Sequence, residues 1–170
     1  MKYILFALLL FSFACTDKKT ENKTLDSSNM EKTKNVAVYN FSDSIEFQQF
    51  IALELDKTHA NLLNPQVSKD SINEVVAEWT KYHQSLGAHL AQNNFEWGVQ
   101  DSLVKVFHKI YFTEGGQVKH HFFNVFNQDM SAEKKDEFSQ QIKAFDENVK
   151  IDLNRQSPFA QCGKASYQNL

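Results

Sequence analysis

Six histidines and two cysteines are the side chains of this sequence that could bind a metal ion or act as a base or nucleophile. The spacings that mark metal centres do not occur: there is no HExxH motif, no two histidines four residues apart on one predicted helix, and no close pair of cysteines. Three separate elements could still supply ligands, because His83 lies on the apolar face of a predicted helix and His108 and His120 lie on two predicted strands. We therefore treat His83, His108 and His120 as candidate ligands of zinc or haem, and predict no other cofactor. The alternative is that His83 is a neutral core histidine bonded to a neighbour.

Motifs for nucleophilic or phosphoryl-transfer catalysis are also missing. The chain has no GxSxG or SxxK motif, and the pair Gly115 and Gly116 joins two predicted strands, so it forms a turn rather than a phosphate-binding loop. Cys162 is a free thiol if Cys15 is modified, and a buried inert thiol is favoured over a catalytic Cys–His pair. We predict no catalytic residue and expect a protein that is not an enzyme.

The first residues determine where the protein works. One lysine, an apolar run from Tyr3 to Phe13 and the small residue Ala14 precede Cys15, a pattern typical of a secretory signal. The segment resembles the type II signal peptide of bacterial lipoproteins, although Ser12 stands where that family usually has leucine. The resemblance implies cleavage after Ala14 and lipidation of Cys15. An ordinary cleaved signal and an uncleaved anchor are the alternatives.

The resemblance also implies an envelope location. Thr16, rather than aspartate, follows Cys15, which in Gram-negative lipoproteins favours the outer over the inner membrane. The apolar run is shorter than the roughly 20 residues that span a bilayer, whereas two or more acyl chains anchor a protein durably. Residues 15–35 are polar and are predicted to be a flexible tether. The formal charge of −3 lacks the basic excess of a nucleic-acid-binding protein.

Residues 36–170 are predicted to form a single α+β domain of two layers, with helices on a small antiparallel sheet. Hydrophobic periodicity and capping residues predict three helices, over 44–63, 71–94 and 132–149. Runs of β-branched and aromatic residues, bounded by turn signals, predict the strands. These strands span 36–41, 103–112, 118–126, 150–153 and 159–167, the last interrupted at Gly163.

The hairpin register decides which histidines meet. A three-residue loop over 114–116 pairs Phe112 with Val118 and carries His108 and His120 to one face of the hairpin. A shift of one residue would exchange the two faces.

The segment IYFTEGGQV, residues 110–118, lies in an order of hairpin, helix and closing strand. This order is similar to the C-terminal domain of periplasmic energy-transducing proteins of the TonB type. The chain lacks the proline and tryptophan pattern of that family behind the helix, so the resemblance transfers no functional residue.

Three functions remain open from the sequence. The first is a membrane-tethered envelope lipoprotein that acts as a binding or interaction module, with an envelope protein as a possible partner. The second is a metal- or haem-binding domain or enzyme built on His83, His108 and His120. The third is a structural envelope lipoprotein.

Overall fold

The computed structural model describes residues 35–169. The predicted signal peptide, Cys15 and all of the predicted tether except Asn35 lie outside the described residues. The elements follow one another in the order β1 (Ala37–Asn40), α1 (Ser44–Ala52), a 3-10 turn (Leu55–Lys57), β2 (Ala60–Asn61), α2 (Ile72–Gln92), β3 (Leu103–Phe112), β4 (Val118–Val125), α3 (Ala132–Asp146) and β5 (Phe159–Gln168). None of the helices within 35–169 has the length and apolar character needed to cross a membrane.

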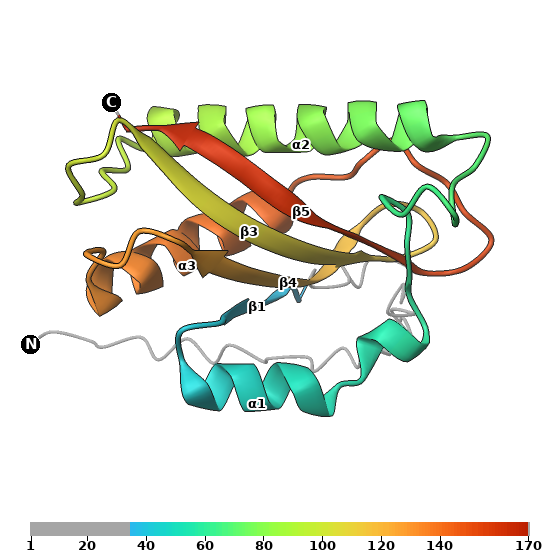
Figure 1. The fold of residues 1–170 in the computed structure, drawn as a ribbon, viewed down its shortest axis with the longest axis horizontal. Helices are drawn as coiled ribbons and strands as arrows, with labels where there is room; N and C mark the ends of the chain where they lie inside the picture. The colour runs from blue at the N-terminus through green and yellow to red at the C-terminus, as the bar shows by residue number, and fades with distance from the viewer. Residues whose placement is uncertain (1–34, 170) are drawn as a thin grey trace, which may run out of the picture. The chain divides into compact units, whose positions relative to one another are not determined.

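One five-stranded sheet organises the domain, with the strand order β1-β4-β3-β5-β2 (Figure 1). The central strand β3 runs antiparallel to β4 and β5, whereas β1 is parallel to β4 and β2 is parallel to β5. The α+β prediction is therefore confirmed, but the prediction of an antiparallel sheet is wrong at both edges. The two edge strands come from the N-terminal part of the chain and reach their partners through long crossovers, which permit parallel pairing.

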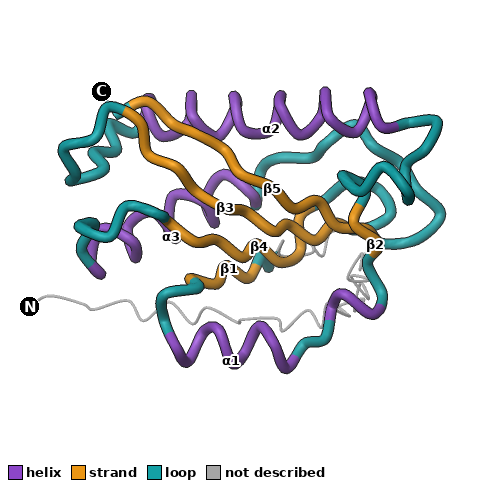
Figure 2. The backbone as a smooth tube through the Cα atoms, in the orientation of Figure 1, coloured by secondary structure: helices purple, strands orange, loops and turns teal. Residues whose placement is uncertain are grey.

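Helices cover both faces of the sheet. Figure 2 shows α2 and α1 at opposite edges of the view with the strands between them. Helix α3 shares the core cluster of α2 and so covers the same face of the sheet. The main core lies beneath α2 and α3 and contains Leu86, Phe138 and Phe112, whereas α1 buries Phe50 against Tyr111 and Phe122 on the opposite face. Alternate residues of β3 therefore enter two different cores, as the pleat of a strand requires.

The prediction of a long first helix is wrong. Asp43 caps the helix as expected, since its carboxylate accepts hydrogen bonds from the backbone N–H groups of Ile45 and Glu46. The helix ends at Ala52, and Glu54 adopts a left-handed backbone with a φ of 48°. The following residues turn away to form β2 beside β5, which leaves Ile51 exposed instead of buried.

The second and third helices are confirmed. The buried residues of α2 follow the predicted stripe and include His83, although Val76 is exposed and the side chain of Ser71 forms no cap. Ser131 caps α3 by accepting a hydrogen bond from the N–H of Lys134. This helix ends at Asp146, three residues earlier than predicted.

The hairpin forms from the predicted strands, but its pairing register shifts by one residue partway along β3 and β4. Gly116 has a φ of 82°, so the turn is as expected, and Phe112 pairs with Val118. A bulge between Tyr111 and Phe112 then moves the pairing by one residue. As a result Ile110 pairs with His121, whereas continuing the predicted pairing of Phe112 with Val118 along the hairpin would have placed His120 opposite Ile110.

Two predictions near the C-terminus also change. Residues 150–153 form no strand, but Lys150 makes an isolated bridge to Gln117, and Ile151 and Leu153 are buried in the core. The closing strand β5 runs through Gly163 without interruption. A Cβ at Gly163 would lie 3.2 Å from the indole of Trp79, so glycine lets α2 pack closely on this strand.

Candidate functional site: a buried histidine row beside a pocket

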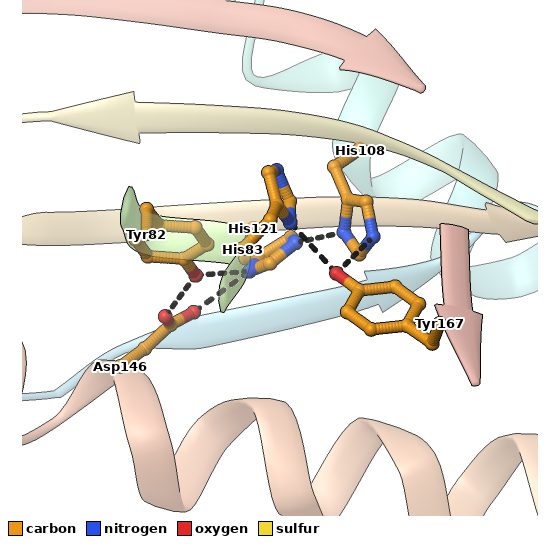
Figure 3. Close-up of polar contacts among 6 residues, drawn as sticks. All are labelled: Tyr82, His83, His108, His121, Asp146 and Tyr167. Carbon is orange, nitrogen blue, oxygen red and sulfur yellow. Dashed lines mark hydrogen bonds and ion pairs between the residues drawn. The ribbon is translucent and has the colours of Figure 1, made fainter. Parts of the chain in front are cut away.

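Six polar side chains form a continuous row between the sheet and the helices α2 and α3 (Figure 3). Each of the five elements that surround the core on this side supplies one or two of them. The row consists of Asp146 from α3, Tyr82 and His83 from α2, His108 from β3, His121 from β4 and Tyr167 from β5. We call this set the histidine row. All six are buried, and His83, at 8% exposure, is the most exposed of them.

Hydrogen bonds connect the row from one end to the other. Asp146 Oδ2 lies 2.8 Å from His121 Nδ1, and its other oxygen accepts a hydrogen bond from the Tyr82 hydroxyl. His121 Nε2 lies 2.8 Å from His108 Nδ1. His108 Nε2 lies 3.0 Å from the Tyr167 hydroxyl, which lies 2.7 Å from His83 Nδ1.

Burial keeps two histidines and both tyrosines of the row uncharged, namely His83, His108, Tyr82 and Tyr167. Loss of water contact, reinforced by His121, lowers the pKa of His83 from 6.5 to about 3. Burial, with smaller contributions from His83 and His121, also lowers the pKa of His108 well below its usual value. Burial and the nearby Asp146 raise the pKa of Tyr82 and of Tyr167 well above 10, so both phenols keep their protons.

A pocket of about 790 Å³ opens beside the outer end of the row. Helix α2 lines it with Trp79, His83 and Gly87, the segment after α2 with Phe95 and Trp97, and strand β5 with residues 164–168. Among residues 35–169, the charged side chains that line it are Lys164 and Glu96. The lining is therefore mixed: the aromatic rings of Trp79, Phe95, Trp97 and Tyr167 stand beside about as many polar as apolar side chains. Small-molecule sites likewise combine apolar walls with a few polar groups that fix the ligand's orientation.

His83 connects the row with the pocket. Its Nδ1 is bonded to Tyr167, but its Nε2 is buried and has no hydrogen-bond partner among residues 35–169. A buried polar atom without a partner costs free energy, typically about 1–3 kcal/mol. This unpartnered nitrogen therefore belongs to a side chain that lines the pocket and could accept a hydrogen bond from a bound molecule.

The structure brings two of the three predicted histidines together. The rings of His83 and His108 lie 4.5 Å apart between their centroids. His120 lies on the opposite face of β4, stacked on Tyr39, because the bulge in the hairpin exchanges it with His121. The expectation that His108 and His120 share a face is therefore wrong, whereas the alternative of His83 as a neutral core histidine bonded to a neighbour agrees with its burial and its bond to Tyr167.

Four members of the row were missed from the sequence: His121, Asp146, Tyr82 and Tyr167. Asp146 follows Phe138 and Ile142 at four-residue intervals, so it falls in the buried stripe of α3, where a carboxylate is unusual. That spacing was the signal in the sequence that could have identified Asp146 as a buried residue. The sequence has no such signal for His121, because its position on the buried face depends on a bulge that no glycine marks.

The described part of the chain offers no cluster of three or more His, Cys, Asp or Glu side chains that could hold a metal ion. Both ring nitrogens of His108 and of His121 take part in hydrogen bonds. Among the imidazole nitrogens of the row, His83 Nε2 is therefore the one that has no hydrogen-bond partner and could bind a ligand. A site for zinc or haem stays a prediction.

Cys162 forms no disulfide within residues 35–169 and is half-buried. The amide nitrogen of Asn61 lies 3.5 Å from its sulfur. Its strand position alternates with that of Gln161, which faces α2, so the thiol lies on the face away from the histidine row.

Comparison of the chain with protein-family models, with curated proteins and with solved structures finds no significant match.

Proposed function

We propose that this domain binds a small, mostly apolar molecule that donates a hydrogen bond, in the pocket between α2 and β5. The observation that carries the proposal is the unpartnered Nε2 of His83, a side chain that lines a pocket of about 790 Å³ together with four aromatic rings. A ligand N–H or O–H would satisfy this nitrogen, and the apolar part of the ligand would pack on the aromatic rings.

Substitution of Gly87, which lines the pocket from helix α2, gives a direct test of ligand binding there. A Cβ there would meet only Tyr167, at 3.6 Å, and the residue lies inside a helix without positive φ. Gly87→Leu should therefore fold normally and gain up to about 1 kcal/mol of helix propensity. Its new side chain would occupy the pocket.

The probe is phenylnaphthylamine, an apolar fluorophore with one N–H donor whose emission rises when it leaves water. We expect saturable binding to the wild type, and binding weaker by about tenfold or more, equivalent to about 1.4 kcal/mol, in Gly87→Leu. Ala88→Leu is the matched control, because Ala88 is exposed on the same helix and does not line the pocket. Equal affinities for the two variants, or no binding to the wild type, would contradict the proposal.

We further propose that the domain works as a lipoprotein of the cell envelope, tethered through Cys15 at the outer rather than the inner membrane. The support is the signal-like sequence of residues 1–15 and Thr16 after it. Expression of Cys15→Ser in a bacterium that lipidates such cysteines should move the protein from the membrane to the soluble fraction, with the fold unchanged. Retention in the membrane would favour an uncleaved anchor.

A further inference from the structure

We propose that the histidine row is a proton relay, which moves a proton between His83 in the pocket wall and the buried pair of His121 and Asp146. This inference rests on the proposed pocket and names the class of its ligand. The ligand would be a weak acid, such as a phenol or an enol, whose O–H proton is passed to His83 Nε2. The relay would return the same proton when the ligand leaves as the neutral acid.

The proton positions follow from the bonding pattern. Ionised Asp146 can only accept, so His121 donates through Nδ1 and its Nε2 is left as an acceptor. His108 must then donate through Nδ1 to that nitrogen, and its own Nε2 accepts from the Tyr167 hydroxyl. Tyr167 in turn accepts from His83 Nδ1, which leaves a lone pair on His83 Nε2. In this first arrangement every hydrogen bond of the row is made and every imidazole is neutral.

Adding one proton at His83 Nε2 produces a second arrangement that is equally complete. The His83 Nδ1 proton passes to the Tyr167 oxygen, the Tyr167 proton passes to His108 Nε2, and the His108 Nδ1 proton passes to His121 Nε2. Each of these three transfers follows a hydrogen bond already present, of 2.7, 3.0 and 2.8 Å respectively. His121 ends as an imidazolium beside the Asp146 carboxylate, and His83 and Tyr167 end neutral.

The relay changes where the positive charge is placed. Protonation confined to His83 is unfavourable because burial opposes a charge there. In the second arrangement the charge is on His121, next to a carboxylate 2.8 Å away, so the buried group as a whole becomes neutral. A ligand anion in the pocket would meanwhile receive a hydrogen bond from His83 Nε2.

The groups that can influence this titration come from all the surrounding elements. They are Tyr82 of α2, His108 of β3, His121 of β4, Asp146 of α3, Tyr167 and Lys164 of β5, and Glu96 of the segment after α2. Lys164, as a cation lining the pocket, favours the ligand anion over the neutral acid, whereas the carboxylate of Glu96 opposes it.

The test is a ¹⁵N NMR titration of the histidines in the full soluble domain, because ring nitrogen shifts distinguish the two tautomers and the imidazolium. His83 and His108 should always carry their proton on the same atom, both on Nδ1 or both on Nε2. They should change together, in one transition, as His121 becomes doubly protonated. Mixed tautomers, an imidazolium at His83, or no change over the pH range in which the protein stays folded would overturn the relay.

Two tyrosine variants form a matched pair. Tyr167→Phe removes the hydroxyl that joins His83 to His108, so the two histidines should no longer change together. Tyr82→Phe also removes a buried hydroxyl, but one that bonds Asp146 at the inner end, so the joint transition should remain. Loss of coupling in both variants, or in neither, would count against the relay.

A coloured weak acid separates this inference from the proposed function. Para-nitrophenol should bind to the wild type with a rise in the absorbance of nitrophenolate, and the rise should be lost in Tyr167→Phe. If it binds but ionises equally in both proteins, the relay is refuted while the pocket stands. If phenylnaphthylamine and para-nitrophenol both fail to bind, the pocket proposal falls, and the NMR titration still decides the relay.

Discussion

Acid should destabilise this domain through the histidine row. The pKa of His83 is about 3 in the folded protein and near 6.5 in the unfolded chain, and the pKa of His108 is also lowered by burial. As the pH falls below about 6.5 the unfolded chain therefore binds protons that the folded chain does not. The stability that these two groups contribute is fully present above that pH and is lost as the pH falls toward 3.

The size of the effect follows from counting protons. Unfolding exposes His83 and His108, which bind protons as the pH falls through 6.5, whereas burial keeps both neutral in the folded protein. Up to two protons are thus taken up on unfolding, and each is worth about 1.4 kcal/mol per pH unit once it is fully bound. Because each unfolded imidazole is only half protonated at pH 6.5, the free energy of unfolding should fall by about 3 kcal/mol between about pH 6.5 and pH 5. This is a large share of the roughly 5–15 kcal/mol typical of a domain.

The assay is urea unfolding, followed by tryptophan fluorescence, at a series of pH values. The double variant His83→Gln with His108→Gln should lose about two protons of this pH dependence, or about 2.7 kcal/mol per pH unit. Exposed carboxylates titrate alike in both proteins, so the difference between them isolates the row. Equal slopes for the two proteins, or a wild-type slope below one proton in this range, would refute the reasoning.

Two further predictions concern packing, and each has a control in the same region. Gly116→Ala should destabilise the domain by about 2 kcal/mol or more, because a Cβ there collides with the Ile151 carbonyl oxygen and the φ is 82°. Gly115→Ala should stay within about 0.5 kcal/mol, because a Cβ there would meet only Thr113 Oγ1, at 4.0 Å. Equal unfolding midpoints for these two would contradict the account of the turn. Phe138→Ala should cost about 3–5 kcal/mol because this ring is fully buried against Trp97 and Phe123, while Phe126→Ala, 43% exposed, should cost less than about 1 kcal/mol. Chemical denaturation measures both, and a small effect of Phe138→Ala would show that the core beneath α3 is loosely packed.

The parts of the fold that local sequence determines were predicted well. The apolar stripe of α2 is long and regular, and the hairpin turn contains a glycine with the required positive φ. The parts that failed depend on distant partners. Helix α1 ends early because the chain turns into β2, whose partner Phe159 lies about a hundred residues away in sequence, and no local pattern encodes that pairing.

The candidate site was predicted in part for the same reason. His83 and His108 fall on buried faces that periodicity identifies, so both were placed in the core. His121 replaced His120 because a single bulge moved the register, and a pattern of period two cannot reveal where such a shift occurs. Asp146 and Tyr167 act through contacts between elements, which only the assembled structure brings within hydrogen-bonding distance.

The topology of the sheet limits when the domain can fold during synthesis. Strand β1 pairs with β4, and β2 pairs with β5, so neither has its partner until most of the domain has been made. The first helix likewise buries Phe50 on residues of β3 and β4 that follow it by about sixty positions or more. The N-terminal third of the domain must therefore wait for β3 and β4, and β2 must also wait for β5. The sheet, the pocket and the histidine row all include β5, so each should be completed late.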